Sequence, residues 1–222
     1  MSIQIQGYGG TVAEVDGPTW RALRVAPRPP EYGSLGCYMR GMVTGTMAAG
    51  LAAAANIFSY RWGDATRLSL LTQVTIGAAS NSATGFAIGT AVFALKLARS
   101  FTASSTGGTA ATLTGNNGKL RTSMGGTLVT DIRISSTAAL GLGTASQDTD
   151  AVAASCYGVG SGTTGGVLLT DGAATYLWNP DGSQEHPIVF AQNEGFQIQA
   201  TVPATGTWQA AIGIKWYEVA SY

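Results

Sequence analysis

The side chains that could carry catalytic chemistry are scarce. His186 is the single histidine of the chain, so a catalytic triad or a two-histidine metal motif would have to use it. It lies in residues 184–187, just before an expected strand, where a capping or surface role is usual. The sequence contains no GxSxG, HExxH or CxxC motif. We therefore expect no catalytic residues and a protein that is not an enzyme.

Two glycine-rich stretches imitate nucleotide-binding motifs. Residues 160–165 match GxGxxG, but a dinucleotide site needs a helix to follow, and residues 166–172 have the composition of a strand. Residues 115–120 (GNNGKL) lack the spacing and the Ser or Thr of a phosphate-binding loop. They predict a tight turn instead, because Asn and Gly tolerate positive φ. The sequence thus predicts no cofactor.

Carboxylates in expected loops are the remaining ligand candidates. Asp148 with Asp150, and Asp181 with Glu185, could supply oxygen ligands to Ca²⁺. Neither pair follows the spacing of an EF-hand, so we expect solvated loop charges and no bound metal.

The elements that must position these residues are strands. With 31 glycines, 11% charged and 45% hydrophobic residues, the chain is neither a helical bundle nor a charged disordered chain. Apolar and polar residues repeatedly alternate with period two, without the strand–helix alternation of βαβ units. We predict an all-β fold, an antiparallel β-sandwich of jelly-roll type. The expected strands are residues 56–62, 67–76, 86–98, 127–135, 152–159, 166–170, 175–178, 188–191, 194–202 and 206–219.

The same alternation predicts which side chains form the core. Even-numbered residues of the last strand should share one face, namely Trp208, Ala210, Ile212, Ile214 and Trp216. In residues 127–135, Leu128 should lie on one face with Ile132 and Ile134. Residues 101–126 predict a long loop, with or without a short helical piece, and residues 47–55 a strand edge or a short helix.

Residues 1–36 predict an extended N-terminal arm, and residues 37–222 a single sandwich domain. Prolines in the arm fix φ and disfavour helix in the residues before them. Such an arm is either a loose tail or a strap across a neighbouring molecule. Trp20, Leu23 and Val25 give it apolar surface to bury, which favours the strap.

Charge in this chain is balanced overall but unevenly distributed. The net charge is zero and the pI is near 6.6, so no nucleic-acid partner is expected. Residues 61–133 are predominantly basic and residues 134–222 predominantly acidic. Either the two segments neutralise each other within one fold, or copies of the chain meet basic face to acidic face.

Cysteine content and hydropathy give weaker predictions. Cys37 and Cys156 are too few for a disulfide framework, so two buried thiols are expected, although a single bridge stays open. Residues 41–60 and 68–95 are uncharged, but they are rich in small or polar residues, and we expect no membrane span. The N-terminus does not have the pattern of a secretory signal, which suggests synthesis in a cytosol.

Seven stretches of the chain together carry a resemblance to a known group of proteins. They are FSYRWGD (58–64), ARSFTAS (98–104), GGTAATLTGNNGKLRTSM (107–124), EHPIV (185–189), NEGF (193–196), GTW (206–208) and KWYEV (215–219). Together these stretches resemble a group of small structural proteins of tailed bacteriophages, and the resemblance covers roughly residues 38–222. It implies a non-enzymatic virion component, a β-sandwich that works as a multimer on the capsid or the tail, and it brings no functional residue with it.

The leading functional hypothesis is a capsid decoration or cement protein. It would be made in the cytoplasm of the bacterial host and act in the virion as a homotrimer. Its partners would be the major capsid protein or other virion proteins and its own copies. The contacts would come from the arm and the long loop, through Trp20, Arg28, Pro29, Pro30, Lys119 and Arg121.

The sequence leaves three alternative functions open. Within the structural class, the chain could be a tail, baseplate or fibre-attachment component. It could instead be a carbohydrate-binding jelly roll for host attachment, with Trp178 as the candidate stacking residue. It could also be a hydrolase that uses Glu185, His186 or the loop aspartates.

Overall fold

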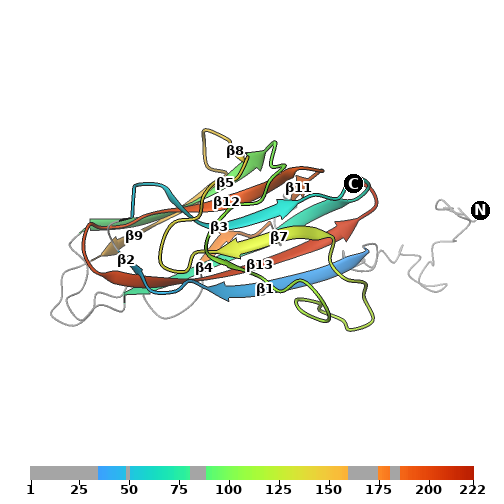
Figure 1. Ribbon diagram of the computed structural model, residues 1–222, viewed down its shortest axis with the longest axis horizontal. Helices are drawn as coiled ribbons and strands as arrows, with labels where there is room; N and C mark the ends of the chain where they lie inside the picture. Colours follow the sequence, from blue (N-terminus) through green and yellow to red (C-terminus); the bar gives the residue numbers. More distant parts are fainter. Residues whose placement is uncertain (1–34, 49–50, 81–88, 160–174, 181–185) are drawn as a thin grey trace, which may run out of the picture. The chain divides into compact units, whose positions relative to one another are not determined.

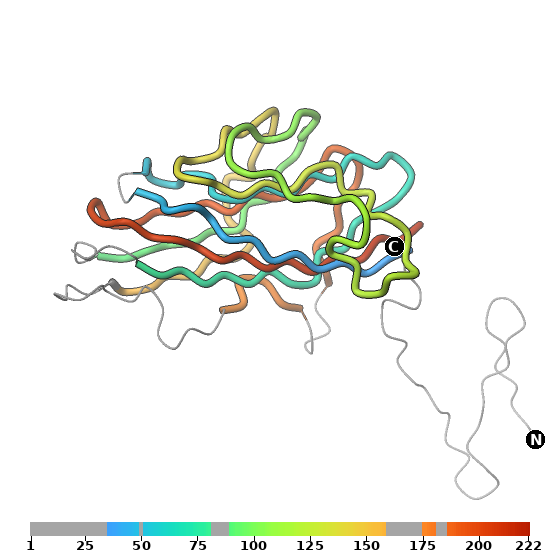
Figure 2. Tube along the Cα trace, turned by 60° about the horizontal axis from the view of Figure 1, so that its bottom comes forward, coloured from blue at the N-terminus to red at the C-terminus, as the bar shows by residue number. Residues whose placement is uncertain are grey.

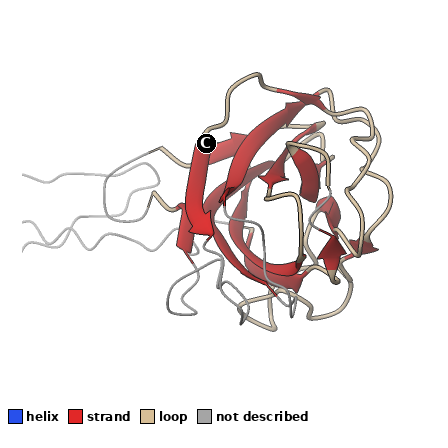
Figure 3. Ribbon diagram, turned by 90° about the vertical axis from the view of Figure 1, so that its left-hand side faces the viewer, coloured by secondary structure: helices blue, strands red, loops and turns tan. Residues whose placement is uncertain are grey.

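The computed structural model describes residues 35–48, 51–80, 89–159, 175–180 and 186–222. The chain divides into two compact units, Met1–Gly33 and Ser34–Tyr222, and the first lies outside the described residues. The described part of the second unit contains strands and loops but no helix. Figure 3 shows these strands in two layers. The prediction of an all-β sandwich is therefore confirmed, while the jelly-roll type and the extended arm stay predictions.

One layer is a six-stranded sheet in the order β1-β13-β4-β10, with β11 also paired to β4 and β2 to β13 (Figure 1). All of its pairings are antiparallel. Its strands are β1 (Gly36–Val43), β2 (Met47–Ala48), β4 (Leu68–Ser80), β10 (Thr175–Trp178), β11 (Ile188–Phe190) and β13 (Thr207–Val219).

The other layer is a seven-stranded sheet in the order β6-β7-β3-β12-β5-β8, with β9 also paired to β5. These pairings too are antiparallel. Its strands are β3 (Ala55–Trp62), β5 (Gly89–Arg99), β6 (Thr109–Ala110), β7 (Val129–Ile134), β8 (Ser146–Gln147), β9 (Ala153–Val159) and β12 (Glu194–Thr201).

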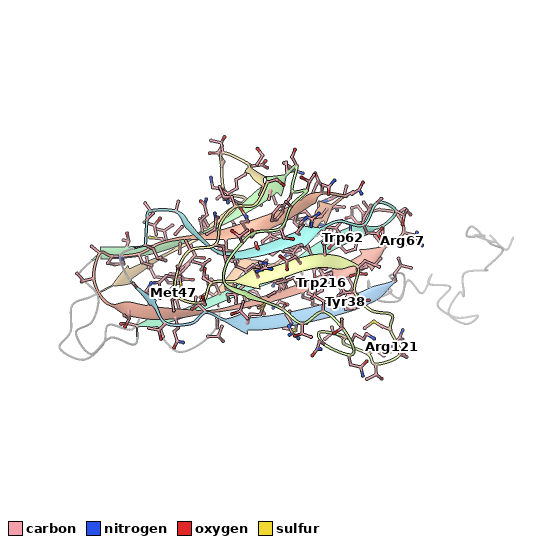
Figure 4. All side chains as sticks on the ribbon, viewed as in Figure 1. Tyr38, Met47, Trp62, Arg67, Arg121 and Trp216 are labelled. Carbon is pink, nitrogen blue, oxygen red and sulfur yellow. The ribbon has the colours of Figure 1, made fainter. Side chains whose placement is uncertain are left out.

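The core between the two sheets is aromatic. The five residues predicted for the inner face of β13 are all buried, which confirms the even spacing. Tyr60 stacks on Phe196 with ring centroids 5.3 Å apart and meets Trp216 edge-on at 5.7 Å. Trp216 in turn stacks on Tyr38 at 5.5 Å, as the labelled side chains in Figure 4 show. Large rings from both sheets thus fill the interior and hold the layers together.

The predicted face of Leu128 is wrong, because a β-bulge changes the register of β7. Arg61 pairs with Asp131, but Trp62 pairs with Val129, so Thr130 is an extra residue on its strand. The bulge turns Val129 into the core, whereas Leu128 is 39% exposed.

Two connections also bear on the sequence predictions. The turn at residues 203–206 joins strands of different sheets, because β12 and β13 belong to different layers. The long loop is confirmed for residues 101–126: it holds only the two-residue β6 and turns, with Gly115 and Gly118 at φ 69° and 78°. Among the described residues of the segment 47–55 there is a strand and a turn rather than a helix.

The described residues of the two uncharged runs form strands joined by short loops and turns. No helix in the described ranges is long and apolar enough to cross a membrane.

Candidate interaction surface

The interface residues predicted from the sequence divide into two groups. Trp20, Arg28, Pro29 and Pro30 lie outside the described residues. The other two, Lys119 and Arg121, lie in the long loop, where the structure can place them.

The tip of this loop packs along the edge of β1. Lys119 forms a β-bridge with Tyr38. The Met39 amide donates to the Gly118 carbonyl at 2.8 Å, and the Leu120 amide donates to the Cys37 carbonyl at 3.2 Å. The loop therefore attaches to the edge of the six-stranded sheet through an isolated β-bridge. Arg121 follows the bridge at an exposed position, below β1 in Figure 4.

The outer face of the seven-stranded sheet is covered by the chain's own loops. Gln197 points away from the aromatic core yet is fully buried. Its amide nitrogen donates to the Ser105 hydroxyl at 3.0 Å and to the Leu142 carbonyl at 3.3 Å. Gln147 donates to the side-chain oxygens of Asn56 and Gln197 at 2.7 and 2.5 Å. These satisfied amides fix two loops on the sheet.

Basic side chains of the same sheet hold further loop carbonyls. The Arg61 Nε donates to the Phe101 carbonyl at 2.6 Å, and an Arg133 guanidinium nitrogen donates to the Gly107 carbonyl at 3.0 Å. Lys96 donates to the carbonyls of residues 148 and 149. In Figure 2 the green to yellow tube lies over one side of the sandwich, and its yellow-green part reaches the end where the blue β1 and the red β13 lie.

Two ion pairs connect the basic segment (61–133) with the acidic segment (134–222) inside this chain. Arg99 contacts Glu194 at 2.6 Å and Asp148 at 3.6 Å. Both contacts join the basic middle of the sequence to its acidic end, as neutralisation within one fold requires. Because the side chains are partly exposed, each pair is worth roughly 0–1 kcal/mol. A meeting of basic and acidic faces between copies stays a prediction.

The outer face of the six-stranded sheet has the opposite character. Because Tyr38, Ile214 and Ile76 are buried and side chains alternate along strands, the neighbouring odd-numbered residues of β1, β13 and this part of β4 point outward. We call this surface the open face. Its successive rows, read across paired strands, are Met39, Lys215 and Gln73; Gly41, Gly213, Thr75 and Tyr176; and Val43, Ala211 and Gly77.

Large apolar side chains on the open face are accessible. Val43 is 61% exposed, Tyr176 57%, and Met39 43%. Leu120, 53% exposed, pairs with Cys37 through the loop tip and so extends the same face. Within the three rows, these side chains are separated by small or polar residues such as Gly41, Gly213 and Thr75.

Charge is nearly absent from the open face. Lys215 is the only charged side chain in the three rows, and its Nζ lies 5.2 Å from the centre of the Tyr217 ring, a cation–π contact. A Cβ added at Gly41 would meet nothing within 4 Å, whereas one at Gly213 would meet the Thr75 hydroxyl at 2.5 Å. A flat surface with exposed apolar residues and one cation suits contact with another protein surface better than chemistry on a substrate.

Sequence reasoning missed Glu218, a buried carboxylate at the end of β13. It is 1% exposed. Its Oε1 accepts hydrogen bonds from the Thr127 hydroxyl at 2.5 Å, the Leu128 amide at 3.0 Å and the Trp216 indole at 3.2 Å. Burial raises the pKa of Glu218, and these donors act in the opposite direction. The sequence did contain a signal for this burial. Glu218 follows Trp216 by two residues, so the alternation that places Trp216 on the inner face of β13 places Glu218 there too.

The remaining candidates do not form a reaction centre in the described chain. His186 is exposed, its Nδ1 lies 2.6 Å from the Pro187 carbonyl, and its ring meets Tyr222 edge-on at 4.9 Å. Asp148 pairs with Arg99, and Asp150 is exposed. No group of three or more potential metal-ligating residues occurs within the described ranges. Asp181, Glu185 and residues 160–165 lie outside these ranges.

The structure also places Trp178 and the two cysteines. Trp178 is half-buried and packs against the core, and its indole N–H is buried without a hydrogen-bond partner. Cys37 is buried as expected, but the prediction is wrong for Cys156, which is exposed. Because Tyr157 packs inward on Phe93, its neighbour Cys156 points outward from β9. The two cysteines are not joined by a disulfide.

Comparison with known proteins adds no relative. No protein-family model matches the chain, and neither a curated protein nor a solved structure matches it. The surface that its own geometry singles out is the open face together with the adjoining loop tip.

Proposed function

We propose that this chain is a non-enzymatic structural protein that assembles through the open face and the loop tip at residues 118–121. The observation that carries the proposal is the contrast between the two sheets. One outer face is covered by loops that its own side chains hold, whereas the other exposes Met39 and Val43. Exposed apolar side chains gathered on one face are a feature of protein contact surfaces.

The setting we propose is a bacteriophage virion, with the chain as a capsid decoration or cement protein. This step rests on the sequence resemblance to phage structural proteins. The partners would be the major capsid protein and neighbouring copies, in a homotrimer. Lys119 and Arg121, in the loop tip beside β1, would contact the shell, together with the arm residues named above.

A tail or baseplate position is the second candidate within the same class, because the same face would serve there. Copy number separates the two positions, since a capsid decoration protein follows the symmetry of the shell and a tail protein does not.

The experiment is to measure the abundance and position of the chain in purified virions by quantitative mass spectrometry and electron microscopy. We expect many copies on the capsid surface. The paired variant Lys119→Glu/Arg121→Glu should fold normally but incorporate poorly. Few copies confined to the tail would favour the second candidate over decoration. Absence from virions would reject both.

A further inference from the structure

We propose that Asn117, next to the loop tip, is a site of spontaneous deamidation, and that docking of the loop tip on β1 controls the rate of this reaction. Asn117 is followed by Gly118 and lies in an exposed turn. The same turn leads into the backbone contacts that hold the loop tip on β1. This modification site goes beyond the proposed function and does not depend on it.

The reaction needs only the chain itself and water. The backbone nitrogen of Gly118 attacks the side-chain carbonyl carbon, Cγ, of Asn117 and loses its proton. The bond between Cγ and Nδ2 breaks, and ammonia leaves with that proton. Water then opens the resulting cyclic imide at one of its two carbonyls, which gives an aspartyl or an isoaspartyl residue. Glycine favours the attack because it has no Cβ to hinder the approach of its nitrogen.

The docked turn holds the two reacting atoms apart. The Lys119 amide donates to the Asn116 carbonyl at 3.3 Å, and Gly118, at φ 78°, is the third residue of this turn. A positive φ at Gly118 but not at Asn117 defines a type II turn, in which the ψ of the second residue is about 120°. This ψ directs the Gly118 nitrogen toward the Hα of Asn117 and away from its side chain. Ring closure therefore requires the turn to open.

Contacts on both sides keep the turn closed. After it, the two backbone hydrogen bonds of the loop tip to β1 measure 2.8 and 3.2 Å. Before it, the Asn117 Nδ2 donates to the Thr114 carbonyl at 2.7 Å. A loop held by a few hydrogen bonds can open locally while the rest of the protein stays folded. Each opening then exposes Asn117 to the attack.

The product cannot restore the docked turn. Both products replace the nitrogen that donates to the Thr114 carbonyl by a carboxylate oxygen, which repels that carbonyl. The isoaspartyl product also adds one atom to the main chain between Asn116 and Gly118, so the Gly118 carbonyl no longer fits the Met39 amide. The reaction therefore releases the loop tip permanently and places a new negative charge near Lys119.

Proline substitutions on β1 test the control by docking. The Met39 amide donates to the loop tip and so points away from β13, and Met39→Pro removes this bond without removing one between β1 and β13. Val43→Pro is the matched control. The amide of Val43 has the same orientation on the same strand, but it takes no part in holding the loop tip. Asn117→Gln is the control for the reaction, because its longer side chain forms the corresponding ring much more slowly.

The measurement is the conversion of Asn117 to aspartyl and isoaspartyl residues, followed by peptide mass spectrometry in the full chain at mildly alkaline pH. We expect conversion in the folded protein at least about 10-fold more slowly than in the urea-unfolded chain, because two backbone hydrogen bonds oppose opening. Met39→Pro should raise the folded rate severalfold, whereas Val43→Pro should leave it unchanged. Circular dichroism verifies that each variant is folded.

Three results would overturn the proposal. If Asn117 stays intact in the folded protein long after the unfolded chain has converted, it is not a modification site of the native chain. Equal rates in the folded and unfolded chains would remove the control by docking, and this comparison needs no variant. Release of the loop tip is tested by hydrogen exchange. The Met39 amide should exchange at least about 10-fold faster in the converted protein, and unchanged exchange would show that the tip stays docked.

Discussion

Replacing Glu218 should separate the role of its hydrogen bonds from the role of its charge. The carboxylate is 1% exposed and accepts from Thr127, Leu128 and Trp216. Glu218→Ala would leave three donors without their acceptor. Each buried donor without an acceptor lowers the free energy of unfolding by roughly 1–3 kcal/mol. The Thr127 hydroxyl can rotate to another partner, so its loss costs less. The free energy of unfolding should therefore fall by about 3–5 kcal/mol.

Glu218→Gln is the matched control. All three donors reach Oε1, so an amide oxygen at the same place keeps them. Two small effects of the substitution on stability oppose each other. The neutral amide avoids the cost of burying a charge. Its nitrogen, however, takes the place of Oε2, which lies 3.2 Å from the Leu128 amide nitrogen. We expect this variant to stay within about 1 kcal/mol of the unmodified protein at pH 7.

The charge itself predicts a pH dependence. Burial raises the pKa of Glu218 above its ordinary 4.5, so the folded state holds this proton more tightly than the unfolded state does. The contribution of Glu218 to stability is thus fully present below pH 4.5 and is lost as the pH rises through the higher pKa of the folded state. Glu218→Gln should lose this component of the pH profile.

The assay is urea unfolding from pH 4 to pH 8, followed by tryptophan fluorescence. Equal destabilisation by Ala and Gln at pH 7 would refute the argument from the three donors. An unchanged pH profile in Glu218→Gln would refute the argument from burial of the charge.

Four further predictions follow from the described residues. Gly195→Ala should destabilise the sandwich by more than about 3 kcal/mol, because its Cβ would lie 2.0 Å from the Tyr60 carbonyl; urea unfolding beside Gly158→Ala measures the difference. Cys156 should react with a maleimide in the native protein and Cys37 only after denaturation, which peptide mass spectrometry can follow; equal reactivity would contradict the assigned burial. Deletion of residues 1–33 should preserve the circular dichroism spectrum, since both sheets belong to Ser34–Tyr222, but should prevent incorporation into virions; unchanged incorporation would remove the arm from the proposed interface. Self-association through the open face should vary little between about 0.05 and 0.5 M NaCl, because the face carries one charge, whereas association of basic with acidic faces should weaken severalfold, so light scattering across this range separates the two.

The sequence predicts best where one strand determines its own environment. The inward face of β13 follows directly from the spacing of its apolar residues, and Trp216 is buried as expected. The face of Leu128 could not be predicted in this way, because it depends on a bulge that exists only in the pairing of β7 with β3. A local pattern fixes a period, but only the partner strand shows where that period is interrupted.

The candidate surface could be recognised only from the tertiary structure. Gly41 and Gly213 are two glycines among many in the sequence. Only the pairing of β1 with β13 shows that they lie side by side on the open face. Lys119 and Arg121 were chosen from the sequence as contact residues, and the structure places the loop tip that carries them beside that face. Gln197 gave no sequence signal of burial, because the loops that cover it come from distant parts of the chain.

The two outer faces explain how so few charges can serve the whole molecule. Arg61 and Arg133 hold loop carbonyls on the seven-stranded sheet, and Arg99 pairs there with Glu194. The loops they fix lie over that sheet. On the open face, additional charges would have to be desolvated whenever a partner binds, at a cost that an apolar contact does not repay. The scarcity of charge from which we expected no catalytic residues also leaves Lys215 as the single charged side chain in the three rows of the open face.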